Sequence, residues 1–115
     1  MKNSKFSVVC RTMVLMGLFC CGVSAQAAST FKPIPQDMFG SHFGYWEFLP
    51  NSFYANPNKQ LPIVIFFHGA GEVGNGRQPD LDVILKLGPP LILNNPSHPL
   101  HNMFDQNEAI VLAPQ

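Results

Sequence analysis

A glycine-rich loop directly after an apolar segment is the part of the sequence best suited to chemistry. The apolar segment is Ile63–Phe67, His68 follows it, and the loop then contains four glycines, Gly69, Gly71, Gly74 and Gly76. Glycines permit positive φ angles and a close backbone approach, so N–H groups of such a loop can point at a ligand atom. N–H groups at the carboxyl end of a buried strand can stabilise an anion or a developing oxyanion. The sequence therefore predicts an anion or oxyanion site in this loop.

The residues His68-Gly69-Ala70-Gly71-Glu72, preceded by the apolar segment, resemble the loop after the third strand of α/β-hydrolases. More narrowly, the chain resembles secreted esterases of the feruloyl esterase, polyhydroxybutyrate depolymerase and phospholipase/carboxylesterase kind. The likeness extends to Tyr45–Pro50, Gly88-Pro89-Pro90 and Val111–Gln115. It implies hydrolysis of a carboxylic ester, in which the loop supplies one oxyanion N–H and a later G-x-S-x-G elbow supplies the nucleophile. This chain has no G-x-S-x-G.

The resemblance assigns the oxyanion donor to the backbone N–H of Ala70, with Gly71 as the second candidate. Each residue lies just beyond the strand end, where the backbone turns. On spacing alone, a tight strand-to-helix turn without a ligand is an equal alternative.

Three neighbouring residues are expected to support this loop. His68 precedes any nucleophile, whereas the histidine of α/β-hydrolases comes last in the chain, so its ring should bond to loop backbone and not act as a base. Gly69 is expected to support the turn because glycine can adopt backbone angles that other residues avoid. A carboxylate beside an oxyanion would oppose the developing charge, so Glu72 should point away, bonding to loop N–H groups or pairing with Arg77. A solvated turn acid is the alternative for Glu72.

Other chemistries have weaker support. His98 and His101, near Asp105, do not have the spacing of a helical ligand pair and suit a surface loop better. The glycine loop begins like a dinucleotide-binding motif, but the acidic residue expected about twenty positions later is missing. Beyond residue 30, four basic residues face seven acidic ones, so no basic patch for nucleic acid is expected. We predict no metal, no cofactor and no nucleic-acid partner.

Residues 1–27 have the three-part pattern of a secretory signal peptide. Basic residues precede an apolar run from Met13 to Val23, and small residues follow, with cleavage expected after Ala25 or Ala27. The run is shorter than the roughly eighteen residues of a membrane span, so no stable membrane anchoring is predicted. All three cysteines of the 115-residue chain lie within this segment. We expect a secreted or periplasmic protein without disulfides.

The strands around the loop are predicted from composition and alternation. Residues 28–44 contain several prolines and glycines and are expected to form an irregular lead-in. Tyr45–Leu49 should be a strand near the sheet edge, forming an antiparallel hairpin with Ile63–Phe67 across the turn at Asn51–Gln60. Because Ile63–Phe67 is apolar without alternation, it should be buried on both faces of a parallel sheet.

A helix and a further strand are expected after the loop. A short helix is predicted from Asp80 to Gly88, ended by the two prolines that follow, and its Asp82 and Lys86 could pair. Ala109–Ala113 is a second continuous apolar run. A strand, a helical crossover and another strand predict a right-handed βαβ unit.

The predicted fold class is α/β, as the N-terminal portion of an α/β-hydrolase with an edge hairpin and one βαβ unit in residues 45–115. Two buried strands cannot complete this fold, so the domain is expected to be incomplete and inactive alone. A completed enzyme would act on a small-molecule or polysaccharide-linked ester. Two alternatives stay open: a small secreted non-catalytic binding protein that uses Tyr45, Trp46 and the loop, or a non-catalytic relic of a broken gene.

Overall fold

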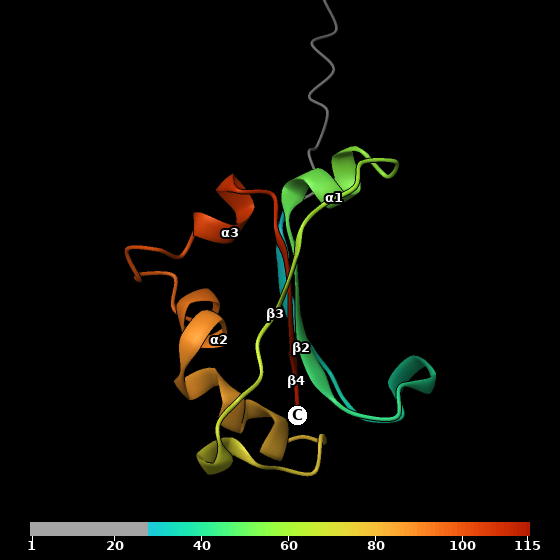
Figure 1. Ribbon diagram of the computed structural model, residues 1–115, viewed down its shortest axis with the longest axis vertical. Helices are drawn as coiled ribbons and strands as arrows, with labels where there is room; N and C mark the ends of the chain where they lie inside the picture. Colours follow the sequence, from blue (N-terminus) through green and yellow to red (C-terminus); the bar gives the residue numbers. More distant parts are fainter. Residues whose placement is uncertain (1–27) are drawn as a thin grey trace, which may run out of the picture.

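The computed structural model describes residues 28–115, and the predicted signal peptide lies outside these residues. It contains a mixed four-stranded sheet with helices, in the order β1-β2-β4-β3 (Figure 1). The strands are β1 (Thr30–Ile34), β2 (Tyr45–Leu49), β3 (Ile63–Ile65) and β4 (Ile110–Pro114). The coarse prediction of an α/β architecture is therefore confirmed. In the described part of the chain, no helix is long and apolar enough to cross a membrane.

The lead-in at 28–44 is not wholly irregular, as had been predicted, because β1 lies within it. β1 pairs antiparallel with β2, so that Thr30 faces Leu49 and Ile34 faces Tyr45. Pro33 lies within β1 and does not prevent pairing, since a proline is tolerated on an edge strand. The remaining part of the lead-in contains a short 3-10 helix, η1 (Met38–Gly40).

The predicted hairpin between the second and third strands is wrong. β2 lies inside the sheet, antiparallel to β1 on one side and to β4 on the other, and it does not pair with β3. A short helix, α1 (Asn51–Ala55), separates β2 from β3 and replaces the tight turn that a hairpin needs. The actual hairpin is formed by β1 and β2.

The predicted parallel strand pair is confirmed. β3 and β4 are parallel neighbours, with Val64 opposite Val111. Their connection contains η2 (Ala70–Glu72), the 3-10 helix η3 (Asp80–Lys86), α2 (Gly88–Asn94) and α3 (Met103–Gln106).

The helix predicted for residues 80–88 differs in form. It is a 3-10 helix that ends at Lys86, and the two prolines begin α2 in its first turn, where missing N–H groups cost nothing. Asp82 accepts a hydrogen bond from Gln78 (3.0 Å), and the described residues contain no Asp82–Lys86 ion pair. With three residues per turn, residues four apart do not align on a 3-10 helix.

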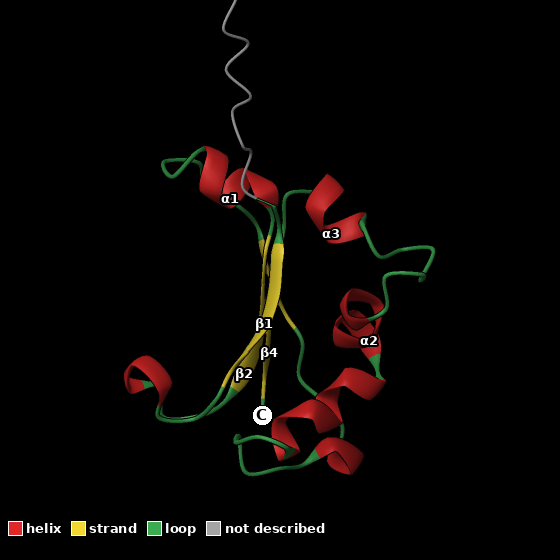
Figure 2. Cartoon of the chain, turned by 180° about the vertical axis from the view of Figure 1, so that it is seen from behind, coloured by secondary structure: helices red, strands yellow, loops and turns green. Residues whose placement is uncertain are grey.

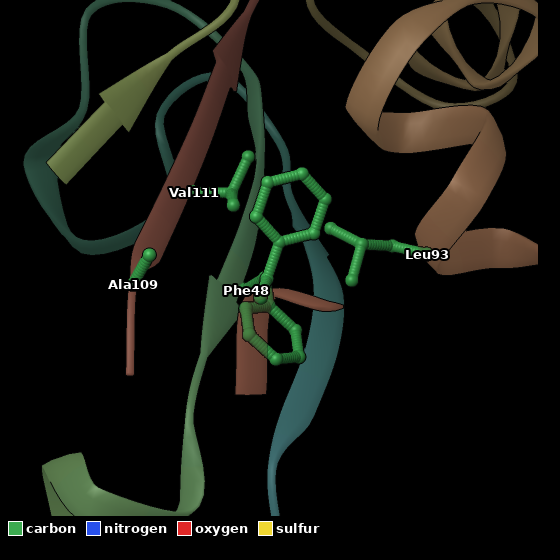
Figure 3. Packing of buried hydrophobic residues seen from close by; sticks show 5 residues of the cluster. Phe48, Leu93, Ala109 and Val111 are labelled. Atoms are coloured by element: carbon green, nitrogen blue, oxygen red, sulfur yellow. The ribbon is translucent and has the colours of Figure 1, made fainter. Parts of the chain in front are cut away.

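The core lies between the sheet and the helices on one of its faces. The two views show α2 and α3 on one side of the sheet (Figures 1 and 2). One buried cluster joins the strands to α2 and α3 and is shown in Figure 3; its members are Phe48, Leu93, Phe104, Ala109 and Val111. A second cluster joins the strands to η3 and contains Trp46, Leu81, Ile84 and Ala113.

The other face of the sheet is open to solvent. It is apolar along β3 and β4, whereas β1 and β2 carry the Lys32–Glu47 ion pair (3.7 Å). Ile63, Ile65 and Phe67 are exposed by 57%, 54% and 75%. The prediction that Ile63–Phe67 is buried on both faces is therefore wrong. β3 is an edge strand of the described sheet and pairs only with β4, and the core clusters lie on the opposite face.

Candidate functional site

The glycine loop lies at the carboxyl ends of the two parallel strands. The pairing of β3 with β4 continues to Phe66, whose N–H donates to the carbonyl of Leu112 (2.8 Å). The backbone then leaves the sheet at His68 and enters η2. In open α/β sheets, ligands bind outside the carboxyl ends of the strands, so the loop occupies the edge where a site is expected.

The N–H groups of Ala70 and Gly71 have no hydrogen-bond acceptor among the described residues. Glu72 closes the turn by donating its N–H to the carbonyl of Gly69 (3.1 Å). The first N–H groups of a helical turn have no partner within that turn. Both residues are exposed, so these two donors are accessible to a ligand but are not enclosed.

Two side chains hold the loop at Gly69. The Nδ1 atom of His68 lies 2.7 Å from the carbonyl oxygen of Gly69, which is the backbone contact expected for this ring. The carboxylate of Glu72 accepts the N–H of Gly69 (2.9 Å), which is one of its two expected arrangements. The other does not occur, because Arg77 pairs with Asp37 (2.8 Å). The Glu72 carboxylate is thus occupied by a loop donor.

The residues that attach the loop to the rest of the molecule were not predicted from the sequence. Gly76 has a positive φ of 70°, and its carbonyl accepts the N–H of Gln36 (2.8 Å). A Cβ on Gly44 would lie 2.0 Å from that same carbonyl oxygen. The Gln115 side chain donates to the carbonyls of Glu72 (3.0 Å) and Asp80 (2.9 Å). Glycine content alone signalled a turn, but it could not indicate these long-range contacts.

An apolar groove of about 640 Å³ runs along the open face of the sheet. Leu112 of β4 lies between Glu47 of β2 on one side and Ile65 of β3 on the other, and all three line the groove. Tyr45, Phe67 and Gln115 line it as well. Trp46 does not reach it. Consecutive residues of a strand point to opposite faces, and Trp46 is buried against η3, where its Nε1 donates to the carbonyl of Leu81 (3.1 Å). The recognition surface expected from Tyr45 and Trp46 together is therefore wrong.

The histidines outside the loop make backbone contacts. His98 Nδ1 accepts the N–H of Leu100 (3.1 Å), and His101 Nδ1 lies 3.2 Å from the carbonyl oxygen of Ile92. Within residues 28–115, no three His, Cys, Asp or Glu side chains are grouped closely enough to hold a metal ion.

No protein-family model matches this chain, and no curated protein is significantly similar to it. What the loop can do chemically follows from its geometry. Two adjacent N–H groups without acceptors in the described residues, at the carboxyl ends of parallel strands, can donate to an oxygen that carries negative charge.

Proposed function

We propose that residues 45–115 are the N-terminal part of a secreted or periplasmic α/β-hydrolase that cleaves carboxylic esters. The observation that carries this proposal is the pair of N–H groups at Ala70 and Gly71, which have no acceptor in residues 28–115 and lie in the loop after β3, the third strand of this described part. In α/β-hydrolases, the loop after the third strand supplies one N–H of the oxyanion hole. The second N–H comes from the residue after the nucleophile.

The loop would act at the acyl-transfer step. A serine oxygen attacks the ester carbonyl while a histidine takes the serine proton, and negative charge develops on the carbonyl oxygen. The N–H of Ala70 or Gly71 donates to this oxyanion together with the N–H beside the nucleophile. The serine elbow is not in this chain, so the chain alone should have no esterase activity.

The open sheet face supports the interpretation as a partial domain. Purely parallel sheets almost always have both faces covered, and their strands are therefore apolar on both sides. Here Ile65 and Phe67 remain more than half exposed beside the parallel pair. An apolar face of this kind fits a sheet whose second layer comes from elsewhere in a larger domain.

The first test is to determine the gene sequence beyond codon 115 in all three frames. The proposal expects a strand followed by G-x-S-x-G, and then an Asp and a His in that order. A native stop codon with no such remnant would refute the partial-hydrolase proposal. A frameshift or stop followed by these motifs would identify the chain as the product of a broken esterase gene.

The second test is to express the extended chain and to measure hydrolysis of p-nitrophenyl butyrate. Ala70→Pro removes the donor with little disturbance, because proline suits the first residue of a helical turn and Gly69 already has an extended backbone (φ −81°, ψ 175°). If Ala70 is the donor, kcat should fall about 10²- to 10³-fold. Ala70→Ser keeps the N–H and is the matched control. Equal activity of both variants would exclude Ala70 and leave Gly71 as the donor to test.

A small secreted binding protein is the second candidate, favoured by the groove on the open face. Its volume of about 640 Å³ lies within the range of small-molecule sites. This candidate requires that the isolated chain unfold cooperatively in urea and that no hydrolase motifs follow codon 115.

A further inference from the structure

We infer that Gln115 is the positioning residue of the oxyanion loop, an inference that rests on the proposed function. Gln115 directly follows β4, and its backbone N–H donates to the carbonyl of Gly44 (2.9 Å). Its side-chain Nε2 donates to two loop carbonyls, those of Glu72 (3.0 Å) and Asp80 (2.9 Å). A carboxamide has two N–H donors, so both bonds can form at once.

These two bonds tie both ends of a loop segment to the sheet. Glu72 is the last residue of η2 and Asp80 is the first residue of η3. The side chain of Gln115 therefore connects both 3-10 helices to the end of β4.

The direction of η2 relates this contact to the oxyanion donors. In a helical turn, carbonyl groups point toward the C-terminal end and N–H groups toward the N-terminal end. Gln115 holds the carbonyl of Glu72 at the C-terminal end of η2. The N–H groups of Ala70 and Gly71, at the other end, consequently point away from Gln115 and stay available to a ligand. Gln115 thereby fixes their direction through the backbone of η2.

The loop leaves space for this side chain at Gly74. A Cβ on Gly74 would lie 2.4 Å from Nε2 and 2.7 Å from Cδ of Gln115. Gly74 has no left-handed φ, so its backbone conformation does not require glycine. The missing side chain instead permits the close approach of the carboxamide. The Gln115 side chain thus occupies the space that a side chain at position 74 would need.

The orientation of the carboxamide is fixed by its partners. Two carbonyl oxygens require the nitrogen on their side, which leaves Oε1 on the other. This buried oxygen has no hydrogen-bond donor in the described residues. Both N–H donors of the Gln115 carboxamide are therefore used in hydrogen bonds to the loop. An apolar side chain of similar length would remove both bonds while occupying similar space.

The test is Gln115→Met in the existing chain, followed by amide hydrogen exchange with ¹⁵N NMR. The informative amides are those of Gly69 and Glu72, because both bond within the loop and report its shape. Their exchange should become about tenfold faster or more, the effect of losing one or two hydrogen bonds. The amide of Val111 in β4 should exchange at its original rate.

Asn107→Leu is the matched control, because Asn107 also donates from its side-chain amide, through Nδ2, to a backbone carbonyl, that of Met103 (2.7 Å). It should leave the exchange of the loop amides unchanged. If Gln115→Met prevents folding, Gly74→Ala is the second variant, since it displaces the carboxamide and should loosen the loop in the same way. In a Gln115→Ala background, Gly74→Ala should have no further effect because the space has been vacated. Additive effects of the two substitutions would overturn the pairing.

The proposed function and the positioning role can fail separately. In the extended esterase, Gln115→Met should lower kcat about tenfold or more and leave KM unchanged, in parallel with faster loop exchange. Faster loop exchange in Gln115→Met, together with full activity of the Ala70→Pro enzyme and of a Gly71→Pro enzyme, would refute the oxyanion role but keep Gln115 as a structural contact. Activity lost in Ala70→Pro, with exchange and kcat unchanged in Gln115→Met, would refute the positioning role alone.

Discussion

Substituting Gly44 by alanine should destabilise the chain far more than the same substitution in the loop itself. Gly44 is buried immediately before β2, against the loop residue Gly76. An added Cβ would lie 2.0 Å from the carbonyl oxygen of Gly76, 2.7 Å from its carbonyl carbon and 2.8 Å from its Cα. All three are backbone atoms, so no side chain can move aside to accept the methyl group.

The expected loss of stability follows from the contacts that must shift. Separating the two backbones strains the hydrogen bonds from Gln115 to Gly44 (2.9 Å) and from Gln36 to Gly76 (2.8 Å). Each such bond contributes about 0.5–1.5 kcal/mol, and overpacking costs about 1–3 kcal/mol in its own right. The free energy of unfolding should therefore fall by roughly 2–6 kcal/mol, a large part of the total for a small domain.

Urea unfolding followed by tryptophan fluorescence measures this effect, because Trp46 is the only tryptophan and is buried beside η3. Gly71→Ala is the matched control. No atom lies within 4 Å of its Cβ position and its φ is not left-handed, so it should change the free energy of unfolding by less than about 1 kcal/mol, in the stabilising direction if at all. Equal unfolding midpoints for the two variants would refute the close approach of Gly44 and Gly76.

Two further predictions concern the two faces of the sheet. Trp46→Phe removes the donor from the buried carbonyl of Leu81 and should reduce the free energy of unfolding by about 1–3 kcal/mol, measured by urea unfolding with circular dichroism; an unchanged midpoint would contradict the bond. Phe67→Ser, at a side chain that is 75% exposed, should lower the fluorescence of bound anilinonaphthalene sulfonate and change stability by less than about 0.5 kcal/mol. Unaltered dye fluorescence would show that this residue does not form the apolar surface.

Sequence patterns correctly predicted those strands and helices that are marked by a run of neighbouring residues. Continuous apolar runs located β3 and β4, and the parallel crossover followed from the helical segment between them. The helical segment predicted to begin at Asp80 exists, and two of its residues, Leu81 and Ile84, are fully buried. The helix type was not predicted, because 3-10 and α-helical turns bury similar positions over so short a segment.

The pairing of β1 and β2, unlike that of β3 with β4, could not be predicted from the same patterns. Residues 28–44 contain the prolines of a loop, yet β1 forms there because an edge strand can accommodate Pro33. β4 lies between β2 and β3 in the sheet. This order depends on segments that are far apart in the sequence and not on the turn after Pro50. Neither outcome has a signal within a few residues of the element concerned.

In the candidate site too, contacts between residues close in sequence were predictable and contacts between distant residues were not. The loop and its contacts at His68 and Glu72 were predictable, because they lie within a few positions of one another. Gln115 lies 43 and 35 positions from Glu72 and Asp80, whose carbonyls it holds. Its role depends on β4 ending beside the loop, which only the folded chain reveals.

The pattern along β4 distinguishes the two proposed functions. Val111 and Ala113 face the core, whereas Leu112 and Pro114 line the groove on the open face. A sheet with one solvated face normally alternates apolar and polar residues, and a strand that is apolar on both sides is typical of a sheet covered on both. β3 repeats this pattern, with Val64 packed against the core and Ile65 exposed. Two adjacent parallel strands thus carry the composition of a doubly covered sheet, which favours the partial hydrolase over a complete binding protein.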